Sequence, residues 1–299
     1  MNNNNIEELN KILPEKGPNI NEVSKYIEKY KDDIIVIKYG GNVFIDRQIF
    51  SNFVSDLSIL QKLGLSVVVV HGGGPRIKRE LDKSNISSKF VRGLRVTDER
   101  IINIVEKVLI EFNEDIVSSL SDLNAKAISL NTKENNVIEI EPESKELGFV
   151  GIPNKINIEF IKEKINEKII PIISPLGLGL DKKTYNINGD TAAGAIAKSL
   201  KSRRLLLMTN VEGVLNKNNN LIEEISSSKI LGMIEDKTIT EGMIPKINTC
   251  LDAVHNGVTA VAIIDGRKKH SVLFEIFSDK GSGTLIRKWI IFLIKKTYY

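Results

Sequence analysis

The chain has 299 residues, and its 41% hydrophobic content allows it to bury a large core. Its net charge of +4 arises from 42 basic and 38 acidic residues, and with only 6% aromatic residues this small excess argues against a nucleic-acid-binding face. The single cysteine, Cys250, excludes an intrachain disulfide and a cysteine metal cluster, so we expect it to be buried and structural. No run reaches the roughly 18–20 apolar residues of a membrane span, so we expect no membrane partner.

The first part of the chain alternates predicted helices and strands. Apolar side chains at helical spacing indicate a helix over 20–31, which precedes the first strand and can form an outer arm. Further along the chain, the residue patterns predict a strand at 34–38, a helix at 48–63, a strand at 66–70, helices at 75–83 and 98–121, and strands at 125–130, 136–140 and 169–173.

The second part of the chain repeats this rhythm. It predicts helices at 190–201 and 243–256, strands at 205–209 and 260–264, and a closing turn at 281–284. Strands that alternate with helices indicate an α/β fold, a three-layer αβα sandwich around a mainly parallel open sheet. Ligands of such folds bind at the carboxyl ends of the strands, so we expect the site there.

Two glycine turns follow directly on the first two predicted strands. The first, Gly40-Gly41, comes just after Lys38, and the second runs from Gly72 to Gly74. Glycine lets a backbone turn tightly and bring bare N–H groups against a bulky anion, and a helix that starts there adds the positive end of its dipole. The two turns therefore indicate an anionic substrate and the transfer of a charged group.

Polar residues outside the turns add to this site. Arg95 precedes a helix, where its guanidinium suits a carboxylate, and a solvated surface arginine is an equal alternative. Asp190 opens a helix of small residues, and a role as helix N-cap alone would explain it. The loop 209–214 follows a predicted strand and suits nucleotide contacts. Lys38 and Lys246 come from opposite parts of the chain, which favours a bilobed phosphoryl-transfer site, because such transfer needs its negative charge neutralised by lysines, backbone N–H groups and Mg²⁺.

These motifs together resemble one family, because seven of them occur in the same order. They are Lys38-Tyr39-Gly40-Gly41-Asn42, His71-Gly72-Gly73-Gly74-Pro75, Gly93-Leu94-Arg95-Val96-Thr97-Asp98, Tyr185-Asn186-Ile187-Asn188-Gly189-Asp190-Thr191, Gly242-Met243-Ile244-Pro245-Lys246, Ile264-Asp265-Gly266-Arg267 and Leu273-Phe274-Glu275-Ile276-Phe277. The chain resembles the amino acid kinase superfamily and, within it, the acetylglutamate kinases. The resemblance implies a bilobed amino acid kinase fold with an N-terminal helical arm. Its expected parts are the arm at 1–32, an acetylglutamate-binding and dimerising lobe at 33–177, an ATP-binding lobe at 178–288 and a tail at 289–299.

The resemblance also implies a reaction and its residues. The γ-phosphoryl group of ATP passes to the side-chain carboxylate of N-acetyl-L-glutamate, in arginine biosynthesis, with Mg²⁺ carried by the nucleotide rather than by a protein metal site. The implied residues are Lys38 and Lys246 at the transferring group, Asp190 orienting both lysines, Gly40, Gly41 and Gly74 at the phosphoryl oxygens, Gly73, Gly74, Arg95 and Asn186 at acetylglutamate, and Thr209, Asn210, Val211, Glu212, Gly213, Val214, Leu215, Thr238, Ile239 and Thr240 at the nucleotide. The chain departs from the family at Asn210, where aspartate is usual, and at Gly189 and Glu241.

The predicted arm carries a further implication. Family members with such an arm resemble an arginine-inhibited type that forms hexamers, as trimers of dimers, and the feedback-site positions match Tyr26, His270, Glu275 and Gly281. A helix that only caps the sheet is the alternative. The high content of Ile, Lys and Asn resembles plastid-encoded proteins. We therefore expect the chloroplast stroma if the chain is plastid-encoded and the cytoplasm otherwise, with the signalling protein PII as a candidate partner.

Two other interpretations stay open. One is a kinase for another acid, such as N-acetylaminoadipate, aspartate, glutamate or carbamate, since one methylene separates glutamate from aminoadipate and the pocket sequence does not resolve it. The other is a non-catalytic arginine or PII sensor on a kinase scaffold. The presence of Lys38, Asp190 and Lys246 favours an enzyme.

Overall fold

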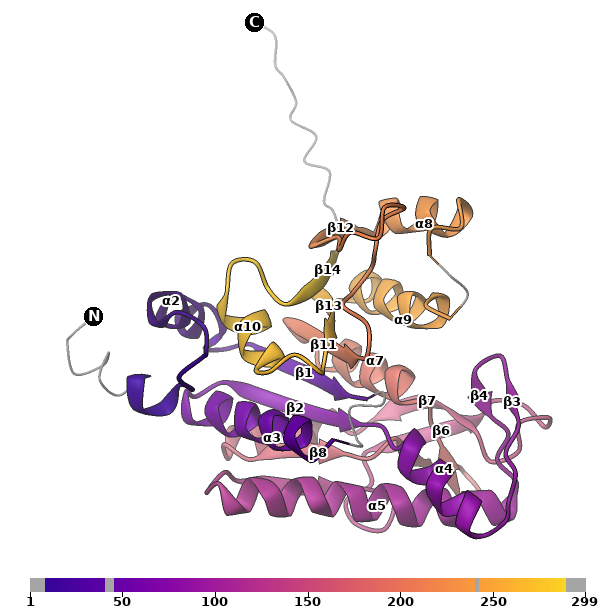
Figure 1. Cartoon of the computed structure of the whole chain (residues 1–299). Helices are drawn as coiled ribbons and strands as arrows, with labels where there is room; N and C mark the ends of the chain where they lie inside the picture. The colour runs from indigo at the N-terminus through magenta and orange to yellow at the C-terminus, as the bar shows by residue number, and fades with distance from the viewer. Residues whose placement is uncertain (1–8, 41–45, 240–241, 289–299) are drawn as a thin grey trace, which may run out of the picture.

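Within residues 9–40, 46–239 and 242–288, which the computed structural model describes, an eight-stranded sheet runs through the molecule (Figure 1). From one edge to the other, its strands are β12 (Glu224–Ser226), β14 (Gly283–Arg287), β13 (Ala260–Asp265), β11 (Arg204–Thr209), β1 (Ile34–Tyr39), β2 (Ser66–His71), β8 (Ile170–Ile173) and β5 (Ala127–Leu130). The strands from β13 to β5 are parallel to their neighbours, whereas β14 runs antiparallel to β13. The predicted mainly parallel open sheet is therefore confirmed.

Helices cover both faces of this sheet. One face carries α2 (Ile20–Tyr30), α3 (Arg47–Lys62), α5 (Glu99–Asp122) and α10 (Ser271–Phe277), and the other carries α6 (Ile158–Asn166), α7 (Gly189–Ser199), α8 (Ser227–Glu235) and α9 (Ile244–His255). The short helix α4 (Gly74–Lys83) packs against α5. This arrangement is the three-layer αβα sandwich that the sequence predicts.

Alternate residues of the central strand β1 point into the two helical layers. Ile35 and Ile37 pack with residues of α2, α3, α5 and α10, whereas Val36 packs with residues of α7 and α9. Each such side chain contributes about 1.5–3 kcal/mol when it is fully removed from water, so both layers help to hold the strand in register. Lys38 lies two residues after Val36 and therefore faces the layer that contains α7.

β1 joins the N-terminal and C-terminal parts of the chain. It pairs with β2 on one side and with β11 on the other, and Figure 1 shows the orange and yellow C-terminal elements beside the indigo strands. The expected lobes at 33–177 and 178–288 would therefore meet inside one continuous sheet.

A small second sheet supplies the rest of the framework. Its strands are β10 (Thr184–Asn186), β9 (Leu176–Leu178), β6 (Ile138–Pro142) and β7 (Gly151–Ile156), and a hairpin of β3 (Phe90–Val91) and β4 (Leu94–Arg95) lies apart from both sheets. The predicted strand at 136–140 is β6. The sequence pattern does not predict β7 or α10. The reason is that β7 has no strict alternation of buried and exposed residues, whereas α10 is buried almost all round and lacks an amphipathic pattern.

The predicted N-terminal arm helix is α2. Asn19 is its N-cap, and the side-chain oxygen of Asn19 accepts a hydrogen bond from the backbone N–H of Asn21 at 2.9 Å. Val23, Tyr26 and Tyr30 are buried against the sheet layer. Within the described part of the expected arm, helix α2 therefore packs onto the body of the molecule.

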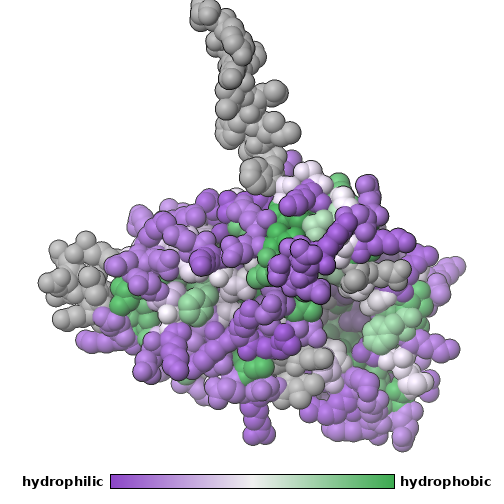
Figure 2. All heavy atoms as spheres, turned by 45° about the horizontal axis from the view of Figure 1, so that its top comes forward, coloured by the Kyte–Doolittle hydropathy of each residue, from purple (hydrophilic) through white to green (hydrophobic). Residues whose placement is uncertain are grey.

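The surface carries no extended apolar area on the face shown in Figure 2, where hydrophilic residues predominate and hydrophobic ones form small separate patches. Among the described helices, none is both long enough and apolar enough to pass through a bilayer. Cys250 is buried and unpaired, as expected.

Candidate active site

The two predicted glycine turns leave the sheet side by side. β1 and β2 pair along their whole length, so Gly40 and the turn 72–74 lie together at the carboxyl ends of the strands. α4 starts at Gly74, with Gly73 as its N-cap and no side chain capping it. The first N–H groups of a helix have no acceptor within the helix, and they favour an anion. The position of both turns agrees with the expected site.

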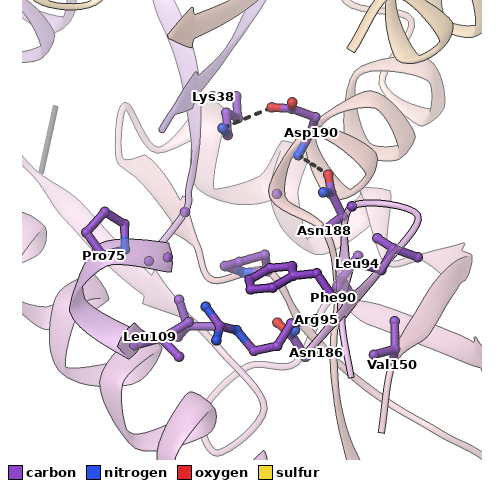
Figure 3. A pocket seen from close by; sticks show the side chains of 18 residues that line it. Lys38, Pro75, Phe90, Leu94, Arg95, Leu109, Val150, Asn186, Asn188 and Asp190 are labelled. Carbon is purple, nitrogen blue, oxygen red and sulfur yellow. Dashed lines mark hydrogen bonds and ion pairs between the residues drawn. The ribbon is translucent and has the colours of Figure 1, made fainter. Parts of the chain in front are cut away.

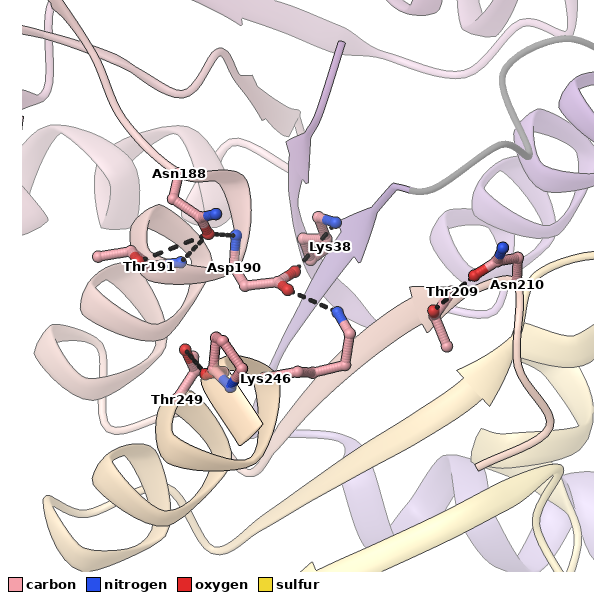
Figure 4. A network of polar contacts seen from close by, with 9 residues as sticks. Lys38, Asn188, Asp190, Thr191, Thr209, Asn210, Lys246 and Thr249 are labelled. Carbon is pink, nitrogen blue, oxygen red and sulfur yellow. Dashed lines mark hydrogen bonds and ion pairs between the residues drawn. The ribbon is translucent and has the colours of Figure 1, made fainter. Parts of the chain in front are cut away.

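Lys38 and Lys246 converge on one carboxylate, that of Asp190 (Figure 4). Lys38 Nζ lies 2.9 Å from Asp190 Oδ1, and Lys246 Nζ lies 2.5 Å from Asp190 Oδ2. Lys38 belongs to β1, Asp190 to the first turn of α7 and Lys246 to the first turn of α9. Three elements from distant parts of the chain therefore build one charged cluster.

Burial and charge together set the protonation of this cluster. Burial disfavours the ionised form of Asp190, but the two lysine ammonium groups outweigh it and hold the pKa of the carboxyl well below its usual range. For Lys38, burial is the strongest effect and lowers the pKa of the ammonium group, against the opposing attraction of Asp190. The site thus holds a firmly ionised carboxylate next to a lysine that releases its proton more easily than usual.

Asn188, rather than Asp190, is the N-cap of α7. The side-chain oxygen of Asn188 accepts hydrogen bonds from the backbone N–H groups of Asp190 and Thr191 at 2.9 and 3.1 Å. The alternative interpretation of Asp190 as a helix cap is therefore wrong, because the residue two positions earlier already occupies that place. The carboxylate of Asp190 is left to bind the two lysines.

A cavity of about 260 Å³ opens beside the charged cluster (Figure 3). Figure 3 shows Lys38 and Asp190 at one end of it and Arg95 and Asn186 at the other. The turn 72–74 forms part of the wall, and the other lining residues, mostly apolar, are Pro75, Ile77, Phe90, Gly93, Leu94, Leu109, Val150, Pro175, Ile187, Asn188 and Gly189. The cavity offers a cationic end on either side of an apolar middle.

Arg95 is buried at the end of β4. Its Nη1 donates to the hydroxyl of Ser88, and its guanidinium lies 4.7 Å from the ring centroid of Phe90. Burial lowers the pKa of this guanidinium, and no carboxylate of the described residues pairs with it. The alternative of a solvated surface arginine is therefore wrong. A buried guanidinium facing a cavity suits the carboxylate of a bound molecule.

The glycines of the site give space to their neighbours. A Cβ atom on Gly40 would lie 1.8 Å from Lys38 Nζ, and a Cβ atom on Gly73 would lie 2.4 Å from Leu109 Cδ2. The Cβ side of Gly74 faces open space. Gly41 lies outside the described residues.

The expected nucleotide loop follows β11. Thr209 ends this strand, and its hydroxyl donates to Asn210 Oδ1 at 3.4 Å (Figure 4). Asn210, Val211, Glu212 and Leu215 are exposed, and the carboxylate of Glu212 lies 3.1 Å from the ammonium of Lys268. The loop therefore presents side chains to solvent at the same edge of the sheet as Lys246.

Other expected nucleotide residues are turned inward. Val214 and Ile239 belong to the apolar core, so their side chains are not available to a nucleotide. A Cβ atom on Gly213 would lie 2.5 Å from the hydroxyl oxygen of Thr284, which accepts the N–H of Val214 at 2.8 Å. Thr238 donates its hydroxyl to Asp236 Oδ1 at 2.5 Å. Thr240 lies outside the described residues, as does Glu241.

Three of the four expected effector residues line a second cavity. These are Tyr26, Glu275 and Gly281. The fourth, His270, does not line it, because its Nδ1 lies 2.6 Å from Asp56 Oδ1 of α3 and both side chains are buried. Placing the His270 side chain in the effector site is therefore not supported by its position.

The sequence analysis does not identify Phe90 and Leu109 as residues that line the cavity. Phe90 stacks near Arg95 from the neighbouring hairpin strand, and Leu109 reaches the cavity from the middle of α5. Neither lies in a glycine or charge motif. Only their spatial proximity reveals them.

Comparison with known proteins places this site in a family. A model of the amino acid kinase family matches residues 33–265. The chain is 55% identical to an acetylglutamate kinase of Pelagibacter ubique, over 94% of this chain and 98% of that protein. It is 44% identical to an acetylglutamate kinase of Methylobacterium nodulans, over 88% of this chain and 91% of that protein. The chain belongs to the acetylglutamate kinases of the amino acid kinase family.

Solved structures agree with the amino acid kinase fold. An N-acetylglutamate synthase from Neisseria gonorrhoeae, complexed with coenzyme A and N-acetyl-glutamate, superposes with a TM-score of 0.82 at 22% identity over 90% of this chain. The superposition covers only 63% of the synthase chain. A carbamate kinase from Giardia lamblia bound to AMP-PNP gives a TM-score of 0.64 at 17% identity, over 86% of this chain and 99% of that chain. At these identities the likeness concerns the fold alone.

Proposed function

We propose that the chain transfers the γ-phosphoryl group of ATP to the side-chain carboxylate of N-acetyl-L-glutamate, giving N-acetyl-L-glutamyl 5-phosphate in arginine biosynthesis. The observation that carries this proposal is the meeting of Lys38 and Lys246 on Asp190 at one end of a cavity whose other end holds Arg95. The family to which the chain belongs supports it.

The two ends of the cavity suit the two carboxylates of the acceptor. Arg95 binds the α-carboxylate and Asn186 the polar acetylamino region, while the side-chain carboxylate points to Lys38. A carboxylate oxygen then attacks the γ-phosphorus, the bond from phosphorus to the bridging oxygen of ADP breaks, and ADP leaves with that electron pair. No proton transfer is needed, because the attacking carboxylate is already ionised.

The lysines and the amides of the glycine turns neutralise the charge that spreads over the transferring group. Lys38, Lys246 and the N–H groups of Gly40, Gly41 and Gly74 face this charge in our proposal, and Asp190 keeps both ammonium groups in place between turnovers. Such groups stabilise the transition state without chemistry of their own.

The nucleotide approaches from the C-terminal part of the chain. We assign its contacts to the loop 209–215, the segment 238–240 and Lys246. We assign Mg²⁺ to the phosphate oxygens of the nucleotide, because Mg²⁺ in kinase sites binds substrate phosphates. Bound there, Mg²⁺ would neutralise phosphate charge.

A coupled assay of ADP release tests the proposed reaction. We expect N-acetyl-L-glutamate to stimulate ADP release. Lys246→Ala should lower kcat by about 10²–10³-fold, because it removes charge that acts in the transition state. Arg95→Ala should mainly raise KM for the acid, by roughly 10–100-fold, because it removes a charge-assisted contact to the bound ground state.

Lys198→Ala is the matched control for Lys246→Ala. Lys198 of α7 pairs with Asp252 of α9, so it bridges the same two helices outside the cavity. We expect kcat to stay within about twofold of the wild type, because exposed ion pairs contribute little. A loss as large as that of Lys246→Ala would refute the catalytic assignment, and the opposite split of kcat and KM would show that the two roles are misassigned.

The same assay separates the alternative functions. A homologue one methylene longer, N-acetylaminoadipate, or aspartate, glutamate or carbamate would stimulate ADP release instead if the acceptor is misassigned. If none of these acids produces any release of ADP, a non-catalytic sensor of arginine or PII is favoured.

We also propose that arginine inhibits the enzyme by binding in the second cavity. Glu275 is buried there and suits the guanidinium of the ligand, while Arg204 suits its α-carboxylate. Arg204 donates from Nε to the hydroxyl of Tyr30 at 2.9 Å, and its buried Nη1 has no hydrogen-bond partner among the described residues. The cavity thus offers opposite charges to the two charged ends of one amino acid.

The pH dependence of inhibition tests this effector site. Burial raises the pKa of Glu275. A protonated carboxyl loses its attraction for a guanidinium, so the arginine concentration for half-inhibition should rise as the pH falls through that raised pKa. Glu275→Gln should weaken inhibition above that pKa, to the level that the wild type shows below it, and remove this dependence. Inhibition that is unaffected by the substitution would place arginine elsewhere.

The remaining assignments are proposals of assembly and location. We propose a division into an arm (1–32), an acetylglutamate lobe (33–177), an ATP lobe (178–288) and a tail (289–299, outside the described residues), and a hexamer built as a trimer of dimers. The residue composition supports PII control and the chloroplast stroma, whereas the bacterial relatives support the cytoplasm. Light scattering and a pull-down with PII test assembly and partner.

A further inference from the structure

His71 is a buried histidine at the entrance of the second glycine turn. It is the last residue of β2, directly before Gly72, and its side chain is fully buried. The edge of its ring packs against Phe112 of α5, with ring centroids 5.0 Å apart and planes at 84°. It does not line the substrate cavity, so it cannot act on the substrate directly.

The imidazole holds the first peptide group of the turn. His71 Nδ1 lies 2.8 Å from the carbonyl oxygen of Gly72. A carbonyl only accepts, so Nδ1 carries the proton and donates it. On its other side Gly72 donates its N–H to the carbonyl of Tyr39 at 2.7 Å. Gly72 is therefore fixed both to the end of β1 and to the buried ring.

The next N–H group takes its direction from this bond. The Gly72–Gly73 peptide is trans and planar, so the N–H of Gly73 points opposite to the carbonyl that the imidazole holds. The N–H groups of Gly73 and Gly74 donate to no acceptor among the described residues, and both glycines line the cavity. The bond from His71 thus turns a free donor away from the core and toward the cavity.

We propose that His71 is a positioning residue that aims the Gly73 N–H at the oxygens of the reacting groups. The inference rests on the proposed phosphoryl transfer. Burial lowers the pKa of His71 to about 4, so the ring stays neutral, with a single proton for this bond, at neutral pH.

Three substitutions separate positioning from packing. The amide nitrogen of Asn lies close to the place of Nδ1, whereas that of Gln lies close to the place of Nε2, and Leu offers no donor. We expect His71→Leu and His71→Gln to lower kcat by about 10–100-fold, because misplacing one donor in the site costs about that much. His71→Asn should recover at least about tenfold of this loss, although it fills less of the buried space.

KM for ATP, the thermal midpoint and a control variant complete the test. We expect KM for ATP to change less than threefold in all three variants if the donor acts in the transition state. Val69→Ala, on the same face of β2 but away from the turn, should lower the thermal midpoint without this loss of kcat.

The outcomes distinguish the proposals. If the kcat values follow side-chain volume, with Gln and Leu above Asn, or if Val69→Ala loses kcat in proportion to its thermal midpoint, His71 only packs and the inference is overturned. If the wild type shows no acid-dependent ADP release in the same assay, the proposed function itself has failed.

Discussion

Asp190 holds two cations that would otherwise repel each other at close range. Both lysine ammonium groups lie within 2.9 Å of its two oxygens, and all three side chains are largely buried. Like charges confined in a poorly solvated place are costly, and the shared carboxylate offsets that cost. Asp190 therefore keeps the site charged and ordered before any phosphate arrives.

Gly40 is the residue on which the position of Lys38 depends most directly. Its missing side chain leaves the space that the Lys38 ammonium occupies, since a Cβ atom would come within 1.8 Å of Nζ. Gly40→Ala should push this ammonium away from Asp190 and lower kcat by about 10²-fold, as expected for a catalytic group displaced by about 1 Å.

Gly232→Ala is the control for that substitution. A Cβ atom on Gly232 of α8 meets no atom within 4 Å, so this change adds a side chain without displacing anything. Steady-state kinetics of both variants check the expectation. Equal kcat values for the two would mean that Lys38 has another way to reach its place.

The alkaline pH dependence follows from Lys38. Because burial lowers its pKa, kcat/KM for ATP, which reports the free enzyme, should fall on the alkaline side with a midpoint below the usual lysine value of about 10.4. Asp190→Asn removes the charge that opposes this effect, so its midpoint should move to still lower pH. A midpoint that does not move on this substitution would exclude Lys38 as the titrating group.

At the scale of elements, α7 carries the carboxylate and Asn188 fixes its first turn. Asn188→Ala should lower the free energy of unfolding by about 1 kcal/mol, the usual effect of losing a cap, and should lower kcat as well, because the turn that holds Asp190 loosens.

Asn157 offers a matched comparison. It caps α6 in the same way, with its side-chain oxygen accepting the N–H of Phe160 at 3.3 Å, and it does not line the cavity. Asn157→Ala should cost similar stability in chemical denaturation and leave kcat near the wild-type value. If both variants lose kcat equally, the effect of Asn188 is one of general stability.

The charged cluster and the glycine turns are predictable from sequence because their chemistry lies in local motifs at strand ends. Lys38 follows a strand of apolar residues, and the parallel αβ pattern fixes which edge of the sheet carries it. The cap of α7 is less predictable, because Asn188 and Asp190 are both good capping residues and only the backbone decides between them.

Other features depend on contacts that no local pattern encodes. His270 contacts Asp56, 214 positions away along the chain, instead of the second cavity. Phe90 and Leu109 reach the substrate cavity through packing of the β3–β4 hairpin and of α5. Similarly, β7 and α10 take their structure from neighbours, not from a periodic pattern of their own.

At the scale of the whole molecule, the second cavity brings together α2 and the segment that follows α10. Tyr26 of α2 donates to Asp279 at 2.7 Å, and burial and this contact raise the pKa of its hydroxyl to about 12. β11 starts at the cavity residue Arg204 and ends at Thr209 in the expected nucleotide loop. One strand therefore connects the proposed effector site with the proposed ATP site.

Tyr26→Phe tests this connection. It removes one hydrogen bond from the wall of the second cavity, and the arginine concentration for half-inhibition should rise about threefold to tenfold, as expected for the loss of a single hydrogen bond. Inhibition curves measured beside the wild type, each normalised to its own activity without arginine, give the comparison. An inhibition curve that coincides with that of the wild type would show that this contact of α2 plays no part in inhibition.

The alternation of β1 between its two helical layers makes the enzyme sensitive to the count of residues before Lys38. Ile35 and Ile37 face one layer, and Val36 and Lys38 the other. Losing a single residue between Ile34 and Ile37 would exchange inside for outside along the rest of the strand and drive an ammonium group toward the aromatic rings of Phe53 and Phe112, in the layer that Tyr39 now faces. Replacing one aliphatic side chain of this strand by another keeps the alternation, whereas shortening or lengthening the strand keeps it only in steps of two residues.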